Sequence, residues 1–385
     1  MRIAFFTDTY LPNTDGVVTA IQNSRAELEL RGHEVYIFSP GTKKQKEENK
    51  DKYVNYFTSA SFKPYPDYRI AIPNFFSIVK VLRELNLDII HSHGIATTGL
   101  AAIHCSQKLN VPSIASFHTL VPEAMHYVTT QPQIQQFLQA AAWKYLHWYY
   151  SHFKKVLVPS EYIMKYLNAH SITNTILQPS GINLNQFSKN DGGEKFRKKF
   201  EISKKTKIVL FVGRIALEKK IEMIIESAQS VINLIPETKF VIVGKGPAEN
   251  HYKDIVKKMG LEKHILFTGY IENDILLSAY AAADAFVFPS LFDTQGLSVI
   301  EAMASGVPAI VKKDAATAEF IEDDKNGYHF SDHFDFHEKI VNAIKNKNKL
   351  SENAKAAVKK FDIETATDKL LGIYETLIAQ NKQKK

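Results

Sequence analysis

Short apolar runs rich in Val, Ile and Phe alternate with longer segments of helical periodicity along the whole chain. This alternation is typical of parallel β-strands joined by α-helices. One series of apolar runs occupies residues 2–6, 34–38, 88–91, 113–117 and 155–158, and a second occupies 207–212, 239–243, 265–267, 285–288 and 308–311. The pattern therefore predicts an α/β protein with two domains, each built on a parallel sheet.

The segment between the two series indicates where the domains divide. Residues 187–206 hold Asp191, Gly192 and Gly193 beside several lysines, and we interpret them as a long loop. We therefore expect a first domain over residues 1–185 and a second over 186–362. Residues 363–380 regain helical periodicity, and we expect that helix to pack back on the first domain. The charged residues 42–52 are expected to form a solvated loop or helix end.

Composition limits the class of protein. The 385 residues are 45% apolar and 23% charged, which excludes a disordered or fibrous chain. No run of 18 apolar residues occurs, so we expect a cytoplasmic protein without a membrane span or secretory signal. Cys105 is the only cysteine, which excludes an internal disulfide and a thiolate zinc cluster.

The excess positive charge lies mostly in the first half. Of the net +7, residues 1–190 contribute 18 Lys and Arg against 13 Asp and Glu. Such an excess suits a nucleotide phosphate, an anionic membrane surface or a nucleic acid. Because the basic residues are not interleaved with stacking aromatic residues on a recognisable module, we expect no nucleic-acid partner.

Polar side chains follow two strands of the predicted second domain. Arg214 and Lys219 come after residues 207–212, and Asp293 and Glu301 come after 285–288. Ligands of α/β domains bind outside the carboxyl ends of parallel strands. Two cations there suit a diphosphate, and two carboxylates suit sugar and ribose hydroxyls. The alternatives are a solvated helix start around Lys219 and a simple N-cap at Asp293.

The predicted first domain offers a glycine and three histidines at comparable places. Gly16 opens a helix after the first strand, where free N–H groups attract an anion, or else it only makes a turn. A metal site is not expected, because His91 and His93 lack a third ligand at suitable spacing and the chain has no Asp-x-Asp pair. His118 is interpreted as a donor to a substrate hydroxyl or phosphate, or as a structural histidine.

Taken in order, the motifs resemble those of the family 4 retaining glycosyltransferases, which have the GT-B fold. The resemblance rests on Gly16-Val17-Val18, Phe117-His118-Thr119, Gly213-Arg214 with Glu218-Lys219, Gly244-x-Gly246-Pro247, and Gly296-Leu297 before residues 301–308. It implies two Rossmann-like domains whose parallel sheets face a central cleft, with a nucleotide-sugar bound mainly by the second. It also implies transfer with retained anomeric configuration, without a metal ion or resident cofactor.

The resemblance also implies a role for each candidate residue. The diphosphate would be held by Gly16, Arg214 and Lys219, the ribose by Glu301, and the donor sugar by His118 and Asp293. The same donor-binding motif includes Thr294, Gln295, Gly296 and Leu297. The candidates for catalysis are then His118, Asp293, Arg214 and Lys219. Asp293 stands where the family usually has a glutamate, so its carboxylate is one methylene shorter.

A narrower resemblance, to the diacylglycerol glycosyltransferases, rests on residues 117–120, 126–128, 179–182 and 293–297. It implies a UDP-hexose donor such as UDP-glucose, a membrane-lipid acceptor, and a peripheral position on the inner face of the cell membrane. Trp143, Trp148, Lys154 and Lys155 would form the acceptor or membrane side, unless this aromatic helix packs on the first sheet. A soluble sugar, sugar-phosphate or polysaccharide acceptor, and a nucleotide-sugar-binding protein without catalysis, are the remaining alternatives.

Overall fold

The computed structural model describes residues 1–13, 15–61, 68–129, 131–188 and 191–383. Contacts divide the chain into two compact units. Unit 1 comprises Met1–Gly181 together with Ile363–Lys385, and unit 2 comprises Ile182–Asp362. The chain therefore leaves unit 1, completes unit 2 and returns to unit 1. The sequence put the first division at residue 185, and the contacts put it at Gly181.

Within the described residues, unit 1 is built on a seven-stranded parallel sheet. From edge to edge, its strands are β3 (Val54–Phe57), β2 (Glu34–Pro40), β1 (Arg2–Phe6), β6 (Ile89–Ser92), β7 (Ser113–Ser116), β8 (Val156–Val158) and β9 (Thr175–Leu177). A separate antiparallel pair is formed by β4 (Ser59–Ser61) and β5 (Arg69–Ala71). The central strand β6 is buried along its whole length, as expected for a strand covered on both faces.

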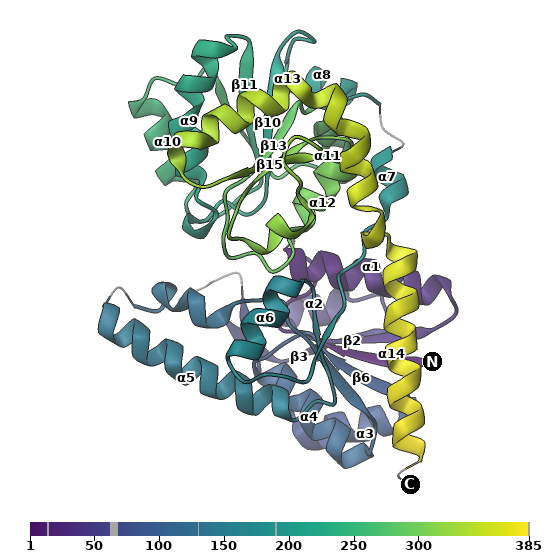
Figure 1. The fold of residues 1–385 in the computed structure, drawn as a ribbon. Coiled ribbons are helices and arrows are strands. Elements are labelled where there is room, and N and C mark those ends of the chain that lie inside the picture. The colour runs from purple at the N-terminus through teal and green to yellow at the C-terminus, as the bar shows by residue number, and fades with distance from the viewer. Residues whose placement is uncertain (14, 62–67, 130, 189–190, 384–385) are drawn as a thin grey trace. The chain divides into compact units, whose positions relative to one another are not determined.

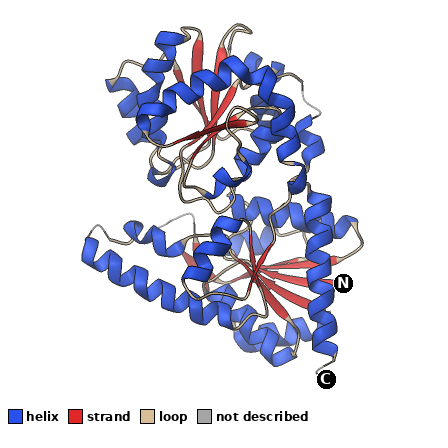
Figure 2. Ribbon diagram, viewed as in Figure 1, coloured by secondary structure: helices blue, strands red, loops and turns tan. Residues whose placement is uncertain are grey.

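Helices surround this sheet (Figure 2). In chain order they are α1 (Gly16–Leu30), α2 (Lys43–Glu48), α3 (Phe75–Leu85), α4 (Thr97–Leu109), the 3-10 helix η1 (Val121–Tyr127), α5 (Pro132–Ser151), α6 (Glu161–Ala169) and α14 (Ile363–Lys382). Residues 42–52 lie toward solvent as expected, but they include a short helix of their own: Thr42 caps α2, which has no buried side chain.

The C-terminal helix α14 lies beside α1 (Figure 1). Leu370, Tyr374 and Leu377 join the apolar cluster formed by β1, β2 and α1. Arg31, just after α1, forms an ion pair with Asp368. The predicted terminal helix therefore completes the core of unit 1, although unit 2 separates it from the rest of that unit along the chain.

Unit 2 is built on a six-stranded parallel sheet, counted over the described residues. Its order is β12 (Ile265–Gly269), β11 (Thr238–Val243), β10 (Lys207–Val212), β13 (Ala285–Phe288), β14 (Ala309–Lys312) and β15 (Gly327–Phe330). Its helices are α7 (Leu184–Ser188), α8 (Glu194–Lys199), η2 (Leu217–Lys219), α9 (Ile221–Leu234), α10 (Glu249–Lys258), α11 (Asn273–Ala282), α12 (Leu297–Ala304), η3 (Ala316–Phe320), α13 (His333–Ala357) and η4 (Lys359–Phe361).

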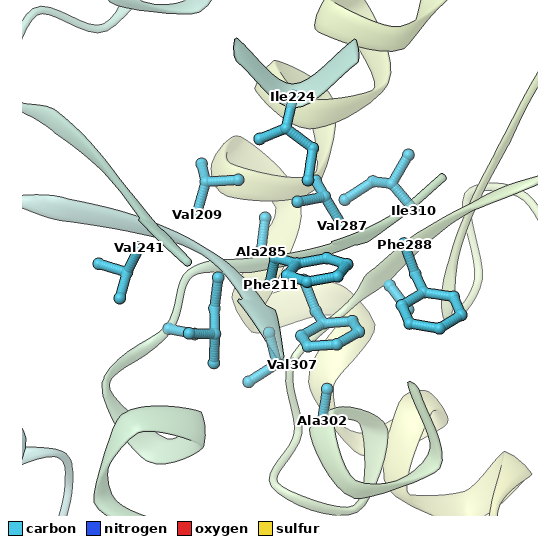
Figure 3. Packing of buried hydrophobic residues seen from close by; sticks show 14 of the residues in the cluster. Val209, Phe211, Ile224, Val241, Ala285, Val287, Phe288, Ala302, Val307 and Ile310 are labelled. Carbon is cyan, nitrogen blue, oxygen red and sulfur yellow. The ribbon is translucent and has the colours of Figure 1, made fainter. Parts of the chain in front are cut away.

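The core of unit 2 lies between this sheet and its helices. Figure 3 shows Phe211 of β10 and Phe288 of β13 close together, with Ile224 of α9 on another side of the cluster. The two phenyl rings stack with their centroids 6.0 Å apart. Such burial of large apolar side chains fixes the position of the strand ends that follow.

The predicted α/β class with parallel sheets is confirmed, but one predicted loop is wrong. Residues 187–206 contain the end of α7 and all of α8. Phe196 of α8 is fully buried, and its N–H donates to Ser278 Oγ at 2.9 Å. Three of the lysines in this segment, Lys195, Lys198 and Lys199, are exposed residues of this short helix. No helix in the described part of the chain combines the length and apolar character needed to cross a membrane.

Candidate active site

Lys219 and Asp293 form an ion pair in unit 2. Lys219 Nζ lies 2.7 Å from Oδ1 and 2.6 Å from Oδ2 of Asp293, so the ammonium bridges both carboxylate oxygens. The two side chains are 15% and 22% exposed, so water screens the pair less than it would on an open surface. The ammonium also lies 5.5 Å from the centre of the Phe288 ring, within cation–π range.

The order of the sheet explains why residues 74 positions apart meet. β10 and β13 are parallel neighbours, so their carboxyl ends share one edge. η2 follows β10 and carries Lys219, while the loop after β13 carries Asp293. Arg214, half-buried, directly follows the turn at the end of β10. The edge therefore holds two cations and a carboxylate.

The N-terminus of α12 lies in the same loop. Gly296 precedes the helix with a φ of +74°, and no described side chain caps the first turn. A Cβ built on Gly296 would overlap Thr317 Cγ2. Of the other donor-motif residues, Gln295 is buried, Thr294 is half-buried, and Leu297 begins the helix and packs on the core. The uncapped N–H groups give this edge a favourable position for an anion.

Glu301 is held by a buried tyrosine. The hydroxyl of Tyr280, in α11, donates a hydrogen bond to Glu301 Oε2 at 2.6 Å. Burial raises the pKa of the Glu301 carboxyl, and the Tyr280 hydrogen bond opposes that shift. One carboxylate oxygen is thus fixed by the protein, and the other can accept a ligand hydroxyl.

Gly16 is the first residue of α1 in unit 1. Asp15 caps the helix, accepting from the N–H groups of Val17 and Val18 at 2.9 Å each. A Cβ added at Gly16 would meet no described atom within 4 Å. Packing within the described chain therefore does not require a glycine here, and its absent side chain leaves the approach to the helix N-terminus open.

His118 follows β7 in unit 1 and contacts His93, which follows β6. His118 Nε2 lies 2.9 Å from His93 Nδ1. Burial lowers the pKa of His118 to about 4. Burial, together with the neighbouring His91 and His118, also lowers the pKa of His93 well below its ordinary value. Both rings are therefore neutral at pH 7.

Two family models together match most of the chain. The model described as Glycosyltransferase Family 4 matches residues 14–186, and the one described as Glycosyl transferases group 1 matches residues 193–361. An alpha-monoglucosyldiacylglycerol synthase of Streptococcus pneumoniae is 30% identical over 350 residues, which cover 89% of this chain and 78% of that protein. This chain belongs to glycosyltransferase family 4.

Other relatives of this glycosyltransferase differ in their named donors and products. An alpha-monoglucosyldiacylglycerol synthase of Acholeplasma laidlawii is 29% identical, covering 100% of this chain and 99% of that protein. A GDP-mannose-dependent alpha-mannosyltransferase of Corynebacterium glutamicum is 28% identical, covering 100% and 91%. These relatives are all glycosyltransferases, but the names of some indicate glucosylation of a lipid and the name of another indicates transfer of mannose.

Solved structures identify the fold of this glycosyltransferase as GT-B. HepE of Anabaena, in complex with UDP and glucose, superposes with a TM-score of 0.76 at 17% identity, covering 98% of this chain and 100% of that one. The sucrose-phosphate synthase of Thermosynechococcus elongatus gives a TM-score of 0.76 at 21% identity, covering 98% and 99%. At such identities the likeness concerns the fold alone.

The predicted membrane-side residues of the glycosyltransferase lie in the second half of α5 and just after it. Trp143 stacks on His170, with ring centroids 3.7 Å apart, so its indole packs within unit 1. Trp148 is 47% exposed. Lys154 is exposed and Lys155 half-buried. The two tryptophans therefore do not form one exposed anchor, because α6 covers the first.

Two features of the site lay outside the sequence prediction. Tyr280 had no signal, because a tyrosine inside a helical pattern is normally a core residue. The contact of His93 with His118 was also missed, since His93 was considered only as a metal ligand. In the described part of the chain, no three His, Cys, Asp or Glu side chains gather as a metal ion would require.

Proposed function

We propose that the enzyme is a retaining hexosyltransferase that moves glucose from UDP-glucose to a hydroxyl of diacylglycerol or a related membrane lipid. The observation that carries the proposal is the Lys219–Asp293 pair beside Arg214 at the carboxyl ends of β10 and β13. The two synthases named above support glucose and a lipid acceptor. HepE, crystallised with UDP and glucose, supports a uridine nucleotide.

In this proposal the donor diphosphate lies on Lys219 and Arg214. An ammonium has three N–H donors, and Asp293 occupies two of those of Lys219, so one remains for a phosphate oxygen. The two cations stabilise the charge that develops on the leaving β-phosphate. N–H groups at the start of α12 would add hydrogen bonds to the same diphosphate.

The reaction breaks the bond between the anomeric carbon and the β-phosphate oxygen and forms one from that carbon to the acceptor oxygen. The acceptor hydroxyl attacks from the face that the phosphate leaves, so the anomeric configuration is retained. Its proton passes to the departing phosphate oxygen, and UDP leaves. Asp293 and His118 orient the sugar ring, and Glu301 accepts from ribose hydroxyls.

We further propose that unit 1 rests on the anionic inner face of the cell membrane, where a lipid acceptor is available. The support is electrostatic. Residues 124–160 contain no Asp or Glu, and they include Lys144, Lys154 and Lys155. Such a stretch favours an anionic surface.

A transfer assay tests the proposal. Radiolabelled UDP-glucose, UDP-galactose and GDP-mannose are each offered with diacylglycerol in anionic vesicles, and with a panel of soluble sugars. We expect label from UDP-glucose in the organic phase. GDP-mannose is included because of the mannosyltransferase relative. Label only in the aqueous phase would reject the lipid acceptor, and neither transfer nor donor hydrolysis would indicate a binding protein without catalysis.

The same assay tests the role of Lys219. We expect Lys219→Ala to lower turnover about 100-fold, because one preorganised charge contact to the leaving group is lost. Lys258→Ala, which removes an exposed cation of α10, is the matched control and should retain activity. A Lys219→Ala variant with wild-type turnover would contradict the assignment.

A further inference from the structure

His91, His93 and His118 form a contiguous group inside unit 1. The rings of His91 and His93 lie 4.0 Å apart, and those of His93 and His118 lie 5.2 Å apart with an angle of 20° between their planes. Because the second pair is nearly coplanar, the 2.9 Å contact between their nitrogens has the geometry of an N–H···N hydrogen bond.

His91 is fully engaged with other residues. Its Nδ1 lies 2.6 Å from the Tyr374 hydroxyl, and its Nε2 lies 2.7 Å from Ser116 Oγ. His91 therefore fixes one face of the His93 ring without forming a hydrogen bond to it. Phe5 meets His93 edge-on at 4.7 Å. The orientation of the His93 ring is determined by this packing.

His93 Nε2 is buried and has no hydrogen-bond partner among the described residues. A neutral imidazole carries its proton on one nitrogen only. If Nε2 carried it, a buried N–H group would lack an acceptor, which is rarer and costlier than a buried lone pair without a donor. The proton of His93 therefore belongs on Nδ1, from which it points at His118.

We propose that His93 is a positioning residue, which donates its Nδ1–H to His118 Nε2 and so fixes the His118 proton on Nδ1. His118 can then donate only from Nδ1, which restricts the group it contacts on the donor sugar to an oxygen that accepts. This inference rests on the proposed function, which assigns His118 to the donor sugar.

Substitution of His93 tests the inference, because a positioning residue should affect kcat more than the KM for the nucleotide-sugar. His93→Leu fills the space of the imidazole with an apolar side chain and removes the N–H donor. We expect kcat to fall about tenfold, as for one lost hydrogen bond. The KM for the nucleotide-sugar should change less than about twofold, because the diphosphate contacts remain. His93→Asn keeps an N–H near the Nδ1 position and should restore most of kcat.

Tyr374→Phe is the structural control. It removes a buried hydrogen bond from the same group, to His91, without touching His118. We expect a lower melting temperature and an unchanged kcat. An equal loss of kcat in Tyr374→Phe and His93→Leu would show that packing alone matters, and wild-type kcat in His93→Leu would equally overturn the proposal.

Nitrogen NMR of histidine-labelled protein tests the tautomers without using activity. We expect the proton of both His93 and His118 on Nδ1, with signals assigned from single His→Asn variants. A His118 proton on Nε2 would overturn the inference. A wild-type enzyme that transfers no sugar would instead reject the proposed function, while the NMR result would still decide the tautomers.

Discussion

Gly296 combines two requirements at a single residue. Its φ of +74° lies in the left-handed region, and a Cβ there would overlap Thr317. Thr317 is fully buried, so it has little room to move. The start of α12, and with it the loop that carries Asp293, therefore depends on the missing side chain.

Gly296→Ala should lower the free energy of unfolding by about 3 kcal/mol, combining backbone strain and overpacking. Gly192→Ala is the matched control, because Gly192 has a φ of +63° and no described atom near its added Cβ. The unfolding free energy of that variant should fall by only about 1 kcal/mol, the cost of placing an L side chain at a positive φ. Urea unfolding measures both, and equal losses would show that Thr317 does not contribute.

The residues of the site could be predicted from their types and their places after strands, but their pairing could not. Arg214, Lys219 and Asp293 all follow strands that the apolar pattern identifies. That Asp293 binds Lys219 depends on β10 and β13 being neighbours in the sheet, and strand order is not encoded in local periodicity. For the same reason, Tyr280 could not be linked with Glu301.

At the scale of elements, strands with strong apolar runs were predictable. β10 and β13 have the bounds that the pattern gave, since Val, Ile, Leu and Phe fill them. The edge strands β3, β9 and β15 were missed. The sequence TIL of β9 is half-buried, and VNYF of β3 and GYHF of β15 mix polar and apolar residues, so each lacks a clear period.

Helix α5 presents apolar side chains to solvent. Its first turns extend away from the sheet of unit 1 (Figure 1), and they carry Ile134, 43% exposed, and Phe137, 73% exposed. Trp148 is exposed farther along the helix. These residues, rather than Trp143, are the apolar part of the membrane surface proposed for unit 1.

Phe137→Glu should weaken binding to vesicles of anionic lipid about tenfold or more, because burial of a phenyl group contributes about 1.5–3 kcal/mol. Vesicle sedimentation measures the change. Phe76→Glu, at a 90% exposed residue of α3, is the control on a different helix of the same unit. Loss of binding in the Phe76 variant alone would place the contact on α3.

At the scale of the molecule, the buried histidines make the stability of unit 1 depend on pH. Burial lowers the pKa of His91 and His93 well below the ordinary value, and that of His118 to about 4. Below about pH 6.5 the unfolded chain binds protons at these residues and the folded chain does not. Stability is therefore complete above pH 6.5 and falls as the pH decreases toward 4.

We expect the urea concentration at the unfolding midpoint of unit 1 to be lower at pH 5.5 than at pH 7.5. Each histidine contributes up to about 1.4 kcal/mol per pH unit to the loss of unfolding free energy. Tryptophan fluorescence reports this unit alone, because Trp143 and Trp148 are the only tryptophans and both lie in α5. His93→Asn should reduce by one the number of protons that the chain takes up on unfolding, and so make the unfolding free energy depend less steeply on pH. The same midpoint at both pH values would show that these histidines titrate normally.

The return of the chain to unit 1 also sets the order in which the protein folds during synthesis. Unit 2 is completed before α14 is translated, because Ile363 follows its last residue. At about 5–20 residues per second, the roughly 180 residues of unit 2 take the ribosome about 10–40 s. Throughout that interval, the face of α1 and β1 that receives Leu370, Tyr374 and Leu377 stays uncovered. The domain begun first is thus finished last, and its nascent form exposes an apolar surface that chaperones recognise.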